Sequence, residues 1–274
     1  MTQRPRKRFG QHFLHDPAVV ARILAAVDPR PGQALVEIGP GRGALTGPLL
    51  RRCERLDVVE IDRDLVRELA GSPEAQAGTL VVHAGDALGF DFTRLARERG
   101  QPLRVVGNLP YNISTPLLFH LLEAAPAIRD VHAMLQREVV QRLAAGPGDE
   151  AYGRLGVMVQ FRCRVERLFD VGPGAFSPAP SVESAVVRLV PLPRPRAPVR
   201  DERLFAEVVR RAFSARRKTL RNALAGLLGP EGFRLAGVNP ATRAEQVAVE
   251  EFARLADAAA DPGAGPGAGA PDGA

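Results

Sequence analysis

Short apolar runs alternate with helical patterns along the first half of the chain, and this alternation constrains the fold more than any other feature. Five runs rich in Val, Ile and Leu have the length of buried strands: 34–38, 56–61, 79–83, 103–108 and 131–136. Helical spacing fills most of the intervals, at 44–53, 63–71, 115–124 and 137–145. Continuous apolar strands separated by helices are typical of a parallel sheet with both faces covered. We therefore predict an α/β fold with a doubly wound, mostly parallel sheet.

The segments on either side of this region have different patterns. Asp16 and Pro17 predict the N-cap and first residue of a helix over 17–27. A helix is also predicted over 153–162, and two β-rich runs follow at 165–171 and 184–190. No helical pattern of useful length separates these two runs. We therefore predict that they form an antiparallel pair that completes the sheet.

The proline-rich segment 191–199 is the clearest domain boundary in the sequence. Residues 200–257 have a helical pattern throughout, including a short helix near 231–236, and the Gly-, Ala- and Pro-rich end is of low complexity. We predict four parts: a basic N-terminal arm over 1–16, the sheet domain over 17–192, a small all-α domain over 200–258 and a disordered tail over 261–274.

The charge of the chain favours a polyanionic partner such as nucleic acid or an anionic membrane surface. Lys and Arg number 37 against 31 Asp and Glu, which gives a net charge of +6 and a pI near 10.2. The basic residues cluster at Arg4–Arg8 and in a second set: Arg210, Arg211, Arg216, Arg217, Lys218 and Arg221. For any one of these residues, a solvated helix face and a phosphate contact to RNA are both open interpretations.

The sequence also disfavours several classes of protein. No apolar stretch approaches the ~20 residues of a membrane span, and no apolar region follows the basic N-terminus as in a secretory signal. Cys53 and Cys163 are far apart and form no metal-binding pattern. We expect a cytoplasmic, reduced protein without a membrane segment or a bound metal.

Residues suited to binding a ligand lie at the ends of the first three strands, where a doubly wound sheet binds its ligands. Gly39, Gly41 and Gly43 form a turn in which the backbone can approach a ligand closely. Glu60 ends the second strand at a spacing that suits an acid holding both hydroxyls of a ribose. Asp86 follows the third strand, where a carboxylate can accept from an adenine amine or cap a turn. The glycine string also fits the G-x-G-x-x-A pattern, so NAD remains a competing ligand.

The string GNLPYNISTPLL at 107–118 follows the fourth strand. Its end has a structural explanation, because Pro116 suits the start of a helix and Ser114 or Thr115 suits the cap. Asn108 and Tyr111 have no such explanation. They lie where a substrate must meet the cofactor.

In this order the motifs closely resemble the KsgA family of S-adenosylmethionine-dependent rRNA adenine N6-dimethyltransferases, over about residues 4–257. The similar strings are GQHFLHD at 10–16, GPGRGALT, VVEID, GDAL, NLPYNIST, FSPAPSVESAVVRL at 176–189 and AFSARRKTLRNAL at 212–224. His12 stands where the family typically has Asn. The resemblance implies a Rossmann-like class I S-adenosylmethionine methyltransferase domain with a small helical rRNA-binding domain after it.

The resemblance also implies a site, residue by residue. The cofactor would be bound by His12, Leu14, Gly39, Gly41, Glu60, Ile61, Asp86, Ala87 and Asn108. The catalytic group around the target adenine would be Asn108, Leu109, Pro110, Tyr111 and Phe176. Tyr111 and Phe176 would stack on the two faces of the base. Phe176 precedes a rigid Ser-Pro-Ala-Pro loop, so we expect it not to be deeply buried.

The implied reaction is dimethylation of N6 on two adjacent adenosines in the 3′-terminal hairpin of 16S rRNA, within the small (30S) ribosomal subunit. We expect a monomer that acts in ribosome biogenesis. The alternatives are a 23S rRNA dimethylase of the antibiotic-resistance type, a non-catalytic assembly factor, a DNA adenine methylase and, least favoured, an NAD-dependent dehydrogenase.

Overall fold

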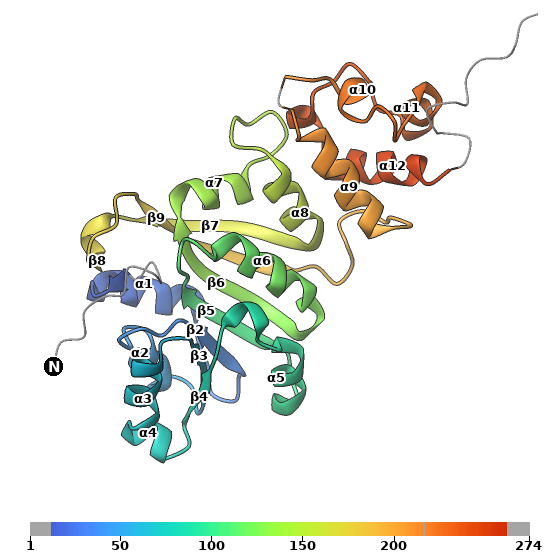
Figure 1. Ribbon diagram of the computed structural model, residues 1–274. Coiled ribbons are helices and arrows are strands. Elements are labelled where there is room, and N and C mark those ends of the chain that lie inside the picture. The colour runs from blue at the N-terminus through green and yellow to red at the C-terminus, as the bar shows by residue number, and fades with distance from the viewer. Residues whose placement is uncertain (1–11, 216, 262–274) are drawn as a thin grey trace, which may run out of the picture. The chain divides into compact units, whose positions relative to one another are not determined.

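The computed structural model describes residues 12–215 and 217–261 (Figure 1). The basic arm Arg4–Arg8, Arg216 and nearly all of the predicted disordered tail lie outside these residues. By its internal contacts the chain divides into two compact units. Unit 1 comprises the chain up to Val140 together with Arg164–Pro191, and unit 2 comprises Gln141–Cys163 together with the chain from Leu192 on.

Unit 1 is built on a seven-stranded sheet with the order β4-β3-β2-β5-β6-β9-β7. The strands are β2 Leu35–Ile38, β3 Leu56–Glu60, β4 Leu80–Ala84, β5 Leu103–Asn108, β6 Ile128–Gln136, β7 Cys163–Val171 and β9 Ser184–Pro191. The strands from β4 to β6 pair in parallel, whereas β9 runs antiparallel to β6. The predicted mostly parallel sheet with an antiparallel final strand is therefore confirmed, and β7 and β9 are neighbours in it.

The strand order reverses between β2 and β5. The chain builds outward from β2 through β3 to β4, and then returns to the other side of β2 to add β5 and β6. Such a switch point leaves a crevice at the carboxyl ends of the strands, which is where ligands bind in open α/β sheets. The fold thus brings the segments after β2, β3, β4 and β5 to one edge of the sheet.

Seven helices of the described chain begin in unit 1: α1 Pro17–Val27, α2 Thr46–Leu50, α3 Arg63–Ala70, α4 Pro73–Gln76, α5 Phe92–Arg99, α6 Ser114–Glu123 and α7 Arg137–Ala144. In Figure 1, α2 and α3 lie on one side of the sheet and α5 lies on the other. The predicted cap of α1 is confirmed, because Asp16 accepts from the backbone N–H groups of Ala18 at 2.8 Å and Val19 at 3.3 Å.

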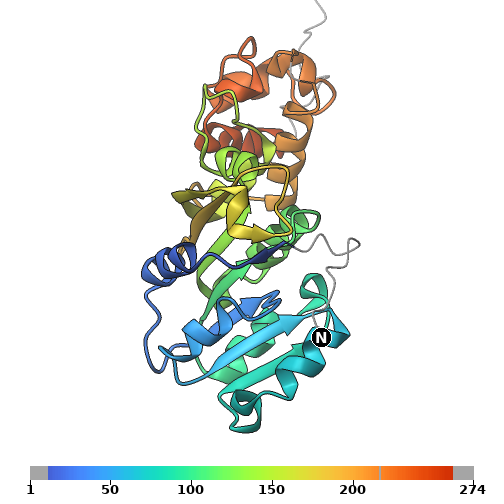
Figure 2. The ribbon, with the colours of Figure 1, turned by 90° about the vertical axis from the view of Figure 1, so that its left-hand side faces the viewer.

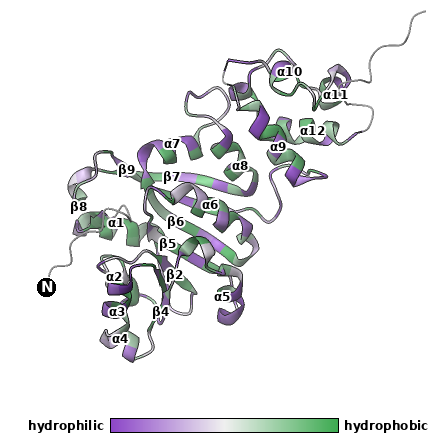
Figure 3. Ribbon diagram, in the orientation of Figure 1, coloured by the Kyte–Doolittle hydropathy of each residue, from purple (hydrophilic) through white to green (hydrophobic). Residues whose placement is uncertain are grey.

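The core of unit 1 lies against the sheet and is made of aliphatic side chains from strands and helices. Figure 3 shows the strands as largely hydrophobic and α5 as largely hydrophilic. A two-stranded ribbon adds to this core: β1, Phe13–Leu14, pairs antiparallel with β8, Phe176–Ser177. Leu14 and Phe176 are opposite each other in this pair, and both belong to the core.

Unit 2 is helical, with α8 Arg154–Arg162, α9 Glu202–Ala212, α10 Leu220–Ala223, α11 Pro230–Ala236 and α12 Val249–Ala259. Phe161 and Phe205 stack at its centre with ring centroids 4.2 Å apart. The proline-rich segment is tied to the same unit, since the backbone N–H of Leu192 donates to the carbonyl of Arg162 at 2.8 Å.

The structure differs from the expected organisation in two places. Residues 141–163 group with the helical unit rather than with the sheet, because Val157 and Phe161 of α8 pack into the core that contains Phe205. The predicted continuous helical pattern over 200–257 is broken into short helices separated by turns, for example between Ala212 and Leu220. Within the described residues, no helix is both long and apolar enough to span a membrane.

Candidate cofactor pocket and active site

A pocket opens at the carboxyl ends of the parallel strands, at the switch point of the sheet. It contains about 1110 Å³ of empty space when its open mouth is counted. Residues of β1 and of the segments after β2, β3, β4 and β5 line it: His12, Phe13, Leu14, Glu37, Ile38, Gly39, Pro40, Gly41, Arg42, Ala44, Leu45, Val59, Glu60, Ile61, Gly85, Asp86, Ala87, Asn108, Leu109, Pro110, Tyr111, Asn112 and Ile113.

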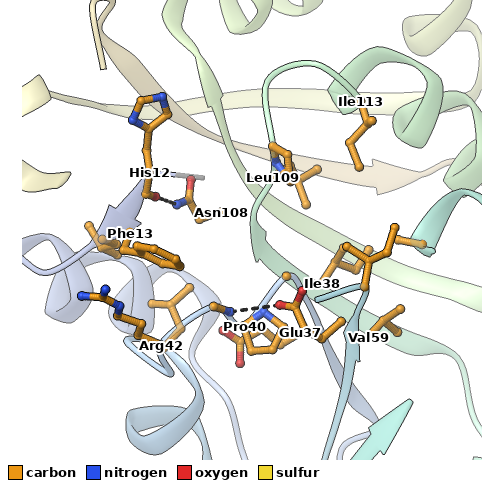
Figure 4. Close-up of a pocket in the computed structure, with 18 of the residues that line it drawn as sticks. His12, Phe13, Glu37, Ile38, Pro40, Arg42, Val59, Asn108, Leu109 and Ile113 are labelled. Carbon is orange, nitrogen blue, oxygen red and sulfur yellow. Dashed lines mark hydrogen bonds between the residues drawn. The ribbon is translucent and has the colours of Figure 1, made fainter. Parts of the chain in front are cut away.

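The glycine loop after β2 needs its glycines for conformation and for space. Gly39, Gly41 and Gly43 all have positive φ values, which side-chain-bearing residues rarely adopt. A Cβ on Gly41 would lie 3.1 Å from the ring of Phe13, so β1 packs closely on the loop. The guanidinium of Arg42 lies over the ring of Phe13, 4.6 Å from the ring centroid (Figure 4).

Glu60 ends β3 with its carboxylate held by backbone donors. It accepts from the N–H of Asp62 at 2.9 Å and from the N–H of Gly41 at 3.4 Å, and it is 5% exposed. Burial raises its pKa, and the backbone hydrogen bonds partly oppose that rise. The second bond links the end of β3 directly to the glycine loop, so these two segments form one wall of the pocket.

Asp86 lies after β4 and also lines the pocket. Its carboxylate accepts from the N–H of Leu88 at 2.9 Å and so caps the short 3-10 helix Ala87–Gly89. Ile61 is 45% exposed although its side chain is large and apolar. An exposed apolar side chain at a pocket mouth is typical of a surface that a ligand covers.

Glu37 is a pocket residue that the sequence analysis did not single out. Its carboxylate is 2% exposed and accepts from the hydroxyl of Thr46 at 2.7 Å. Burial raises the pKa of Glu37 to about 7, the Thr46 bond lowers it, and the nearby charge of Glu60 raises it further. The available signal was an acid inside an otherwise apolar strand, since burying a carboxyl without a role is costly.

Asn108 ends β5 and faces the first residues of the described chain. Its amide nitrogen donates to the backbone carbonyl of His12 at 2.9 Å, which places its oxygen on the opposite side of the amide group (Figure 4). The backbone on either side of Asn108 is restricted, by a hydrogen bond at Leu109 and by close packing at Gly107. The N–H of Leu109 donates to the carbonyl of Met134 at 3.1 Å, and a Cβ on Gly107 would lie 2.6 Å from the carbonyl of Ile38.

Tyr111 is half-buried and is held at both its hydroxyl and its ring. The hydroxyl lies 2.6 Å from the hydroxyl of Ser184, and the ring stacks against the ring of His12 with centroids 5.6 Å apart. His12 is itself held, because its Nδ1 lies 2.8 Å from the carbonyl of Pro178. Burial raises the pKa of the Tyr111 phenol, so the phenol stays protonated at neutral pH.

Phe176 is the one residue of the predicted site that does not line the pocket. It is 3% exposed and belongs to the core of unit 1, so the expectation that it is not deeply buried is wrong. The reason is the antiparallel pairing of β8 with β1, which places Leu14 opposite Phe176 and covers its ring. A rigid proline loop after a residue does not prevent another strand from covering that residue.

All other predicted site residues lie together in the one pocket. Sequence reasoning also missed Phe13, whose contact with Gly41 is visible only in three dimensions. Among the residues described, no group of three or more His, Cys, Asp or Glu side chains is placed to hold a metal ion.

Comparison of the sequence with known proteins finds a matching family and several similar proteins. Residues 2–261 match the family model described as ribosomal RNA adenine dimethylase. The chain is 57% identical over 258 residues to the "Ribosomal RNA small subunit methyltransferase A" of Pseudomonas aeruginosa, a match that covers 94% of this chain and 96% of the relative. It is 53% identical over 260 residues to the protein of the same name from Marinobacter nauticus, with 93% and 92% covered.

Two solved structures share the fold. The 23S rRNA methyltransferase ErmE superimposes with a TM-score of 0.70 and 25% identity, covering 91% of this chain and 100% of that one. A dimethyladenosine transferase from Plasmodium falciparum gives a TM-score of 0.71 at 24% identity, with 89% and 96% covered.

Proposed function

Because the chain belongs to the ribosomal RNA adenine dimethylase family, we propose that it dimethylates N6 of two adjacent adenosines in the 3′-terminal hairpin of 16S rRNA, with S-adenosylmethionine as methyl donor. The observation that carries the proposal is that Asn108 and Tyr111 line one pocket together with the glycine loop. The printed name of the relatives from Pseudomonas and Marinobacter supports the small subunit as the target.

The lining of the pocket fits S-adenosylmethionine. This cofactor supplies a methyl group on a positively charged sulfonium, and it also has an ammonium group and a ribose. Three carboxyl groups, those of Glu37, Glu60 and Asp86, line the pocket and suit such a cation. In the proposal Glu60 accepts from the ribose hydroxyls, Asp86 accepts from the adenine amine, and Ile61 packs on the adenine ring.

Asn108 would activate the target amine by accepting a hydrogen bond from it. The lone pair of an adenine N6 is delocalised into the ring, so the nitrogen must become tetrahedral before it attacks a methyl carbon. The Asn108 oxygen and a backbone carbonyl of Leu109 or Pro110 would accept hydrogen bonds from the two N–H groups of the amine. These bonds favour the tetrahedral nitrogen and so stabilise the transition state more than the ground state. The methylated nitrogen is then cationic and loses its proton without a strong base.

Tyr111 would provide the stacking surface for the target base. A paired adenine cannot present N6 to the pocket, so the base must leave its stack. The half-buried ring of Tyr111 is accessible from the pocket. The ring of Phe176 would contact the other face only after the side chains that cover it shift, because it is buried between β1 and the core.

Basic residues of unit 2 would contact RNA phosphates, but not all of them equally. Arg210 and Arg211 each donate to the carboxylate of Glu207, at 2.7 and 2.6 Å, so the acid partly neutralises their charge. Arg217, Lys218 and Arg221 are exposed, and we propose them as the phosphate contacts of this unit. We further propose that the enzyme acts as a monomer in the cytoplasm, on a nearly assembled small (30S) subunit rather than on naked RNA.

The test is methyl transfer from labelled S-adenosylmethionine to undermethylated small subunits, large subunits and free rRNA in parallel. The proposal expects N6,N6-dimethyladenosine in the small-subunit rRNA. Label confined to large-subunit RNA would instead assign the chain to the antibiotic-resistance type of enzyme. Cofactor binding without transfer to any of the three would indicate an assembly factor.

A further inference from the structure

The hydroxyl groups of Tyr111 and Ser184 lie 2.6 Å apart, although the two residues are 73 positions apart in the sequence. Tyr111 belongs to the loop after β5 and lines the pocket. Ser184 is the first residue of β9 and is 0% exposed. A buried serine that is not on the pocket wall therefore contacts the far end of a side chain that is.

The position of Ser184 is fixed from both sides. It is paired with Gln136 in the antiparallel ladder between β6 and β9. The residue before it, Glu183, accepts from the backbone N–H of Arg137 at 2.9 Å, and its side chain forms an ion pair with Arg137. The Ser184 hydroxyl thus belongs to a strand with a neighbour on each side, because β9 lies between β6 and β7 in the sheet.

The backbone of Tyr111 is fixed separately. Ser114 donates its hydroxyl proton to the Tyr111 carbonyl at 3.1 Å, and the N–H of Ile113 donates to the carbonyl of Pro110 at 3.2 Å. Backbone contacts leave the two side-chain torsions of a tyrosine unspecified. The bond to Ser184 and the stacking on His12 together set the direction of the ring, and only the bond anchors the atom farthest from the backbone.

We propose that Ser184 is a positioning residue, which holds the Tyr111 ring in the orientation needed to stack on the target base. The inference rests on the proposed function, since it assigns a role to a residue that supports the stacking surface. Holding a side chain ready before the substrate arrives removes an ordering cost from the reaction. Loss of the bond should therefore slow methyl transfer without changing cofactor binding, because Ser184 is not in the cofactor pocket.

The experiment compares wild type, Ser184→Ala, Tyr111→Phe and the double variant under single-turnover conditions, with RNA and S-adenosylmethionine saturating. A net hydrogen bond of ordinary strength corresponds to a loss of about 3- to 10-fold in rate for each single variant. The double variant should lose no more than either single one, because both substitutions remove the same bond. Ser181→Ala, an exposed serine of the same loop, is the matched control and should keep the wild-type rate.

The Kd for S-adenosylmethionine, measured by calorimetry on the same proteins, separates positioning from a general structural role. The proposal expects this Kd to be unchanged in Ser184→Ala. An unchanged transfer rate in Ser184→Ala, losses that multiply in the double variant, or a cofactor Kd that rises in parallel with the rate loss would each overturn it. Absence of transfer by the wild type would overturn the proposed function itself, and the positioning role with it.

Discussion

Glu37 shows how a single pocket residue can lower the stability of the free protein. Its carboxyl is 2% exposed and its pKa is raised to about 7 by burial, from an ordinary value of 4.5. At a pH between these two pKa values, Glu37 is therefore mostly protonated in the folded chain and mostly ionised in the unfolded chain. By linkage, the contribution of Glu37 to the free energy of unfolding falls as the pH rises from about 4.5 to about 7.

Glu37→Gln should remove this pH dependence. A neutral amide keeps an oxygen that can accept from Thr46 and carries no charge to desolvate. Near pH 8 we expect the variant to unfold at a higher temperature than wild type, by an amount equivalent to about 2–3 kcal/mol, and near pH 5 we expect little difference. Thermal unfolding at both pH values measures this, and a variant less stable than wild type near pH 8 would contradict it.

The same substitution should weaken cofactor binding. An ionised Glu37 favours a cationic ligand, so the gain in stability and the loss of affinity have one cause. Calorimetric titration near pH 8 should show a Kd for S-adenosylmethionine about 10-fold higher in the variant. Equal affinities would show that the carboxylate does not face the positive groups of the cofactor.

At the scale of elements, the site depends on the close approach of β5 to β2. Gly107 makes this approach possible, because a Cβ there would lie 2.6 Å from the carbonyl of Ile38 and 2.9 Å from the side chain of Leu109. Backbone cannot move aside as a flexible side chain can. The position of Asn108 therefore depends on its neighbour having no side chain.

Gly107→Ala should displace β5 and cost about 1–3 kcal/mol of unfolding free energy, with a loss of methyl transfer. Gly89→Ala is the matched control, since a Cβ at Gly89 would have nothing within 4 Å. Chemical denaturation of the two variants makes the comparison. Equal stabilities for Gly107→Ala and Gly89→Ala would mean that the strands do not approach each other as closely as the structure indicates.

Local signals explain which elements were predictable. The helix α1 has a cap and a proline within its own sequence, and the apolar strands of the sheet are recognisable by composition alone. The helix α5 was missed because only Phe92, Leu95 and Ala96 are buried among its polar residues. Its Arg99 donates to the buried carboxylate of Asp57 at 2.8 Å, a long-range contact that no local pattern reveals.

The same distinction applies to the site. Residues in motifs at strand ends were predicted to lie together, and the pocket contains them, whereas the burial of Phe176 depends on pairing with β1, which lies far away in the sequence. The bond between Tyr111 and Ser184 is equally non-local. Sequence patterns thus located the pocket residues, and tertiary pairing decided which side chains support them.

At the scale of the whole molecule, the chain divides into two compact units, and the cofactor pocket belongs to only one of them. The Phe161–Phe205 stack lies in the core of unit 2, whereas every pocket residue lies in unit 1. Stability of unit 2 and affinity for the cofactor should therefore be separable properties.

Phe205→Ala tests this separation. Removing a fully buried phenylalanine should lower the unfolding free energy of unit 2 by about 3–5 kcal/mol. Hydrogen exchange should show the loss of protection in α8, α9 and α12, while the Kd for S-adenosylmethionine stays at the wild-type value. A weaker cofactor affinity, or an equal loss of protection in β2 and β3, would show that the two units unfold together.

The central claim is that Asn108 serves the transfer of methyl groups to an adenine N6 in small-subunit rRNA. The most direct measurement is nucleoside analysis of undermethylated small subunits after incubation with S-adenosylmethionine and either wild type or Asn108→Ala. The wild type should produce N6,N6-dimethyladenosine, and the variant should lose at least about 100-fold in rate, as expected when a transition-state acceptor is removed. Dimethyladenosine formed at the wild-type rate by Asn108→Ala, or none formed by the wild type, would contradict the claim.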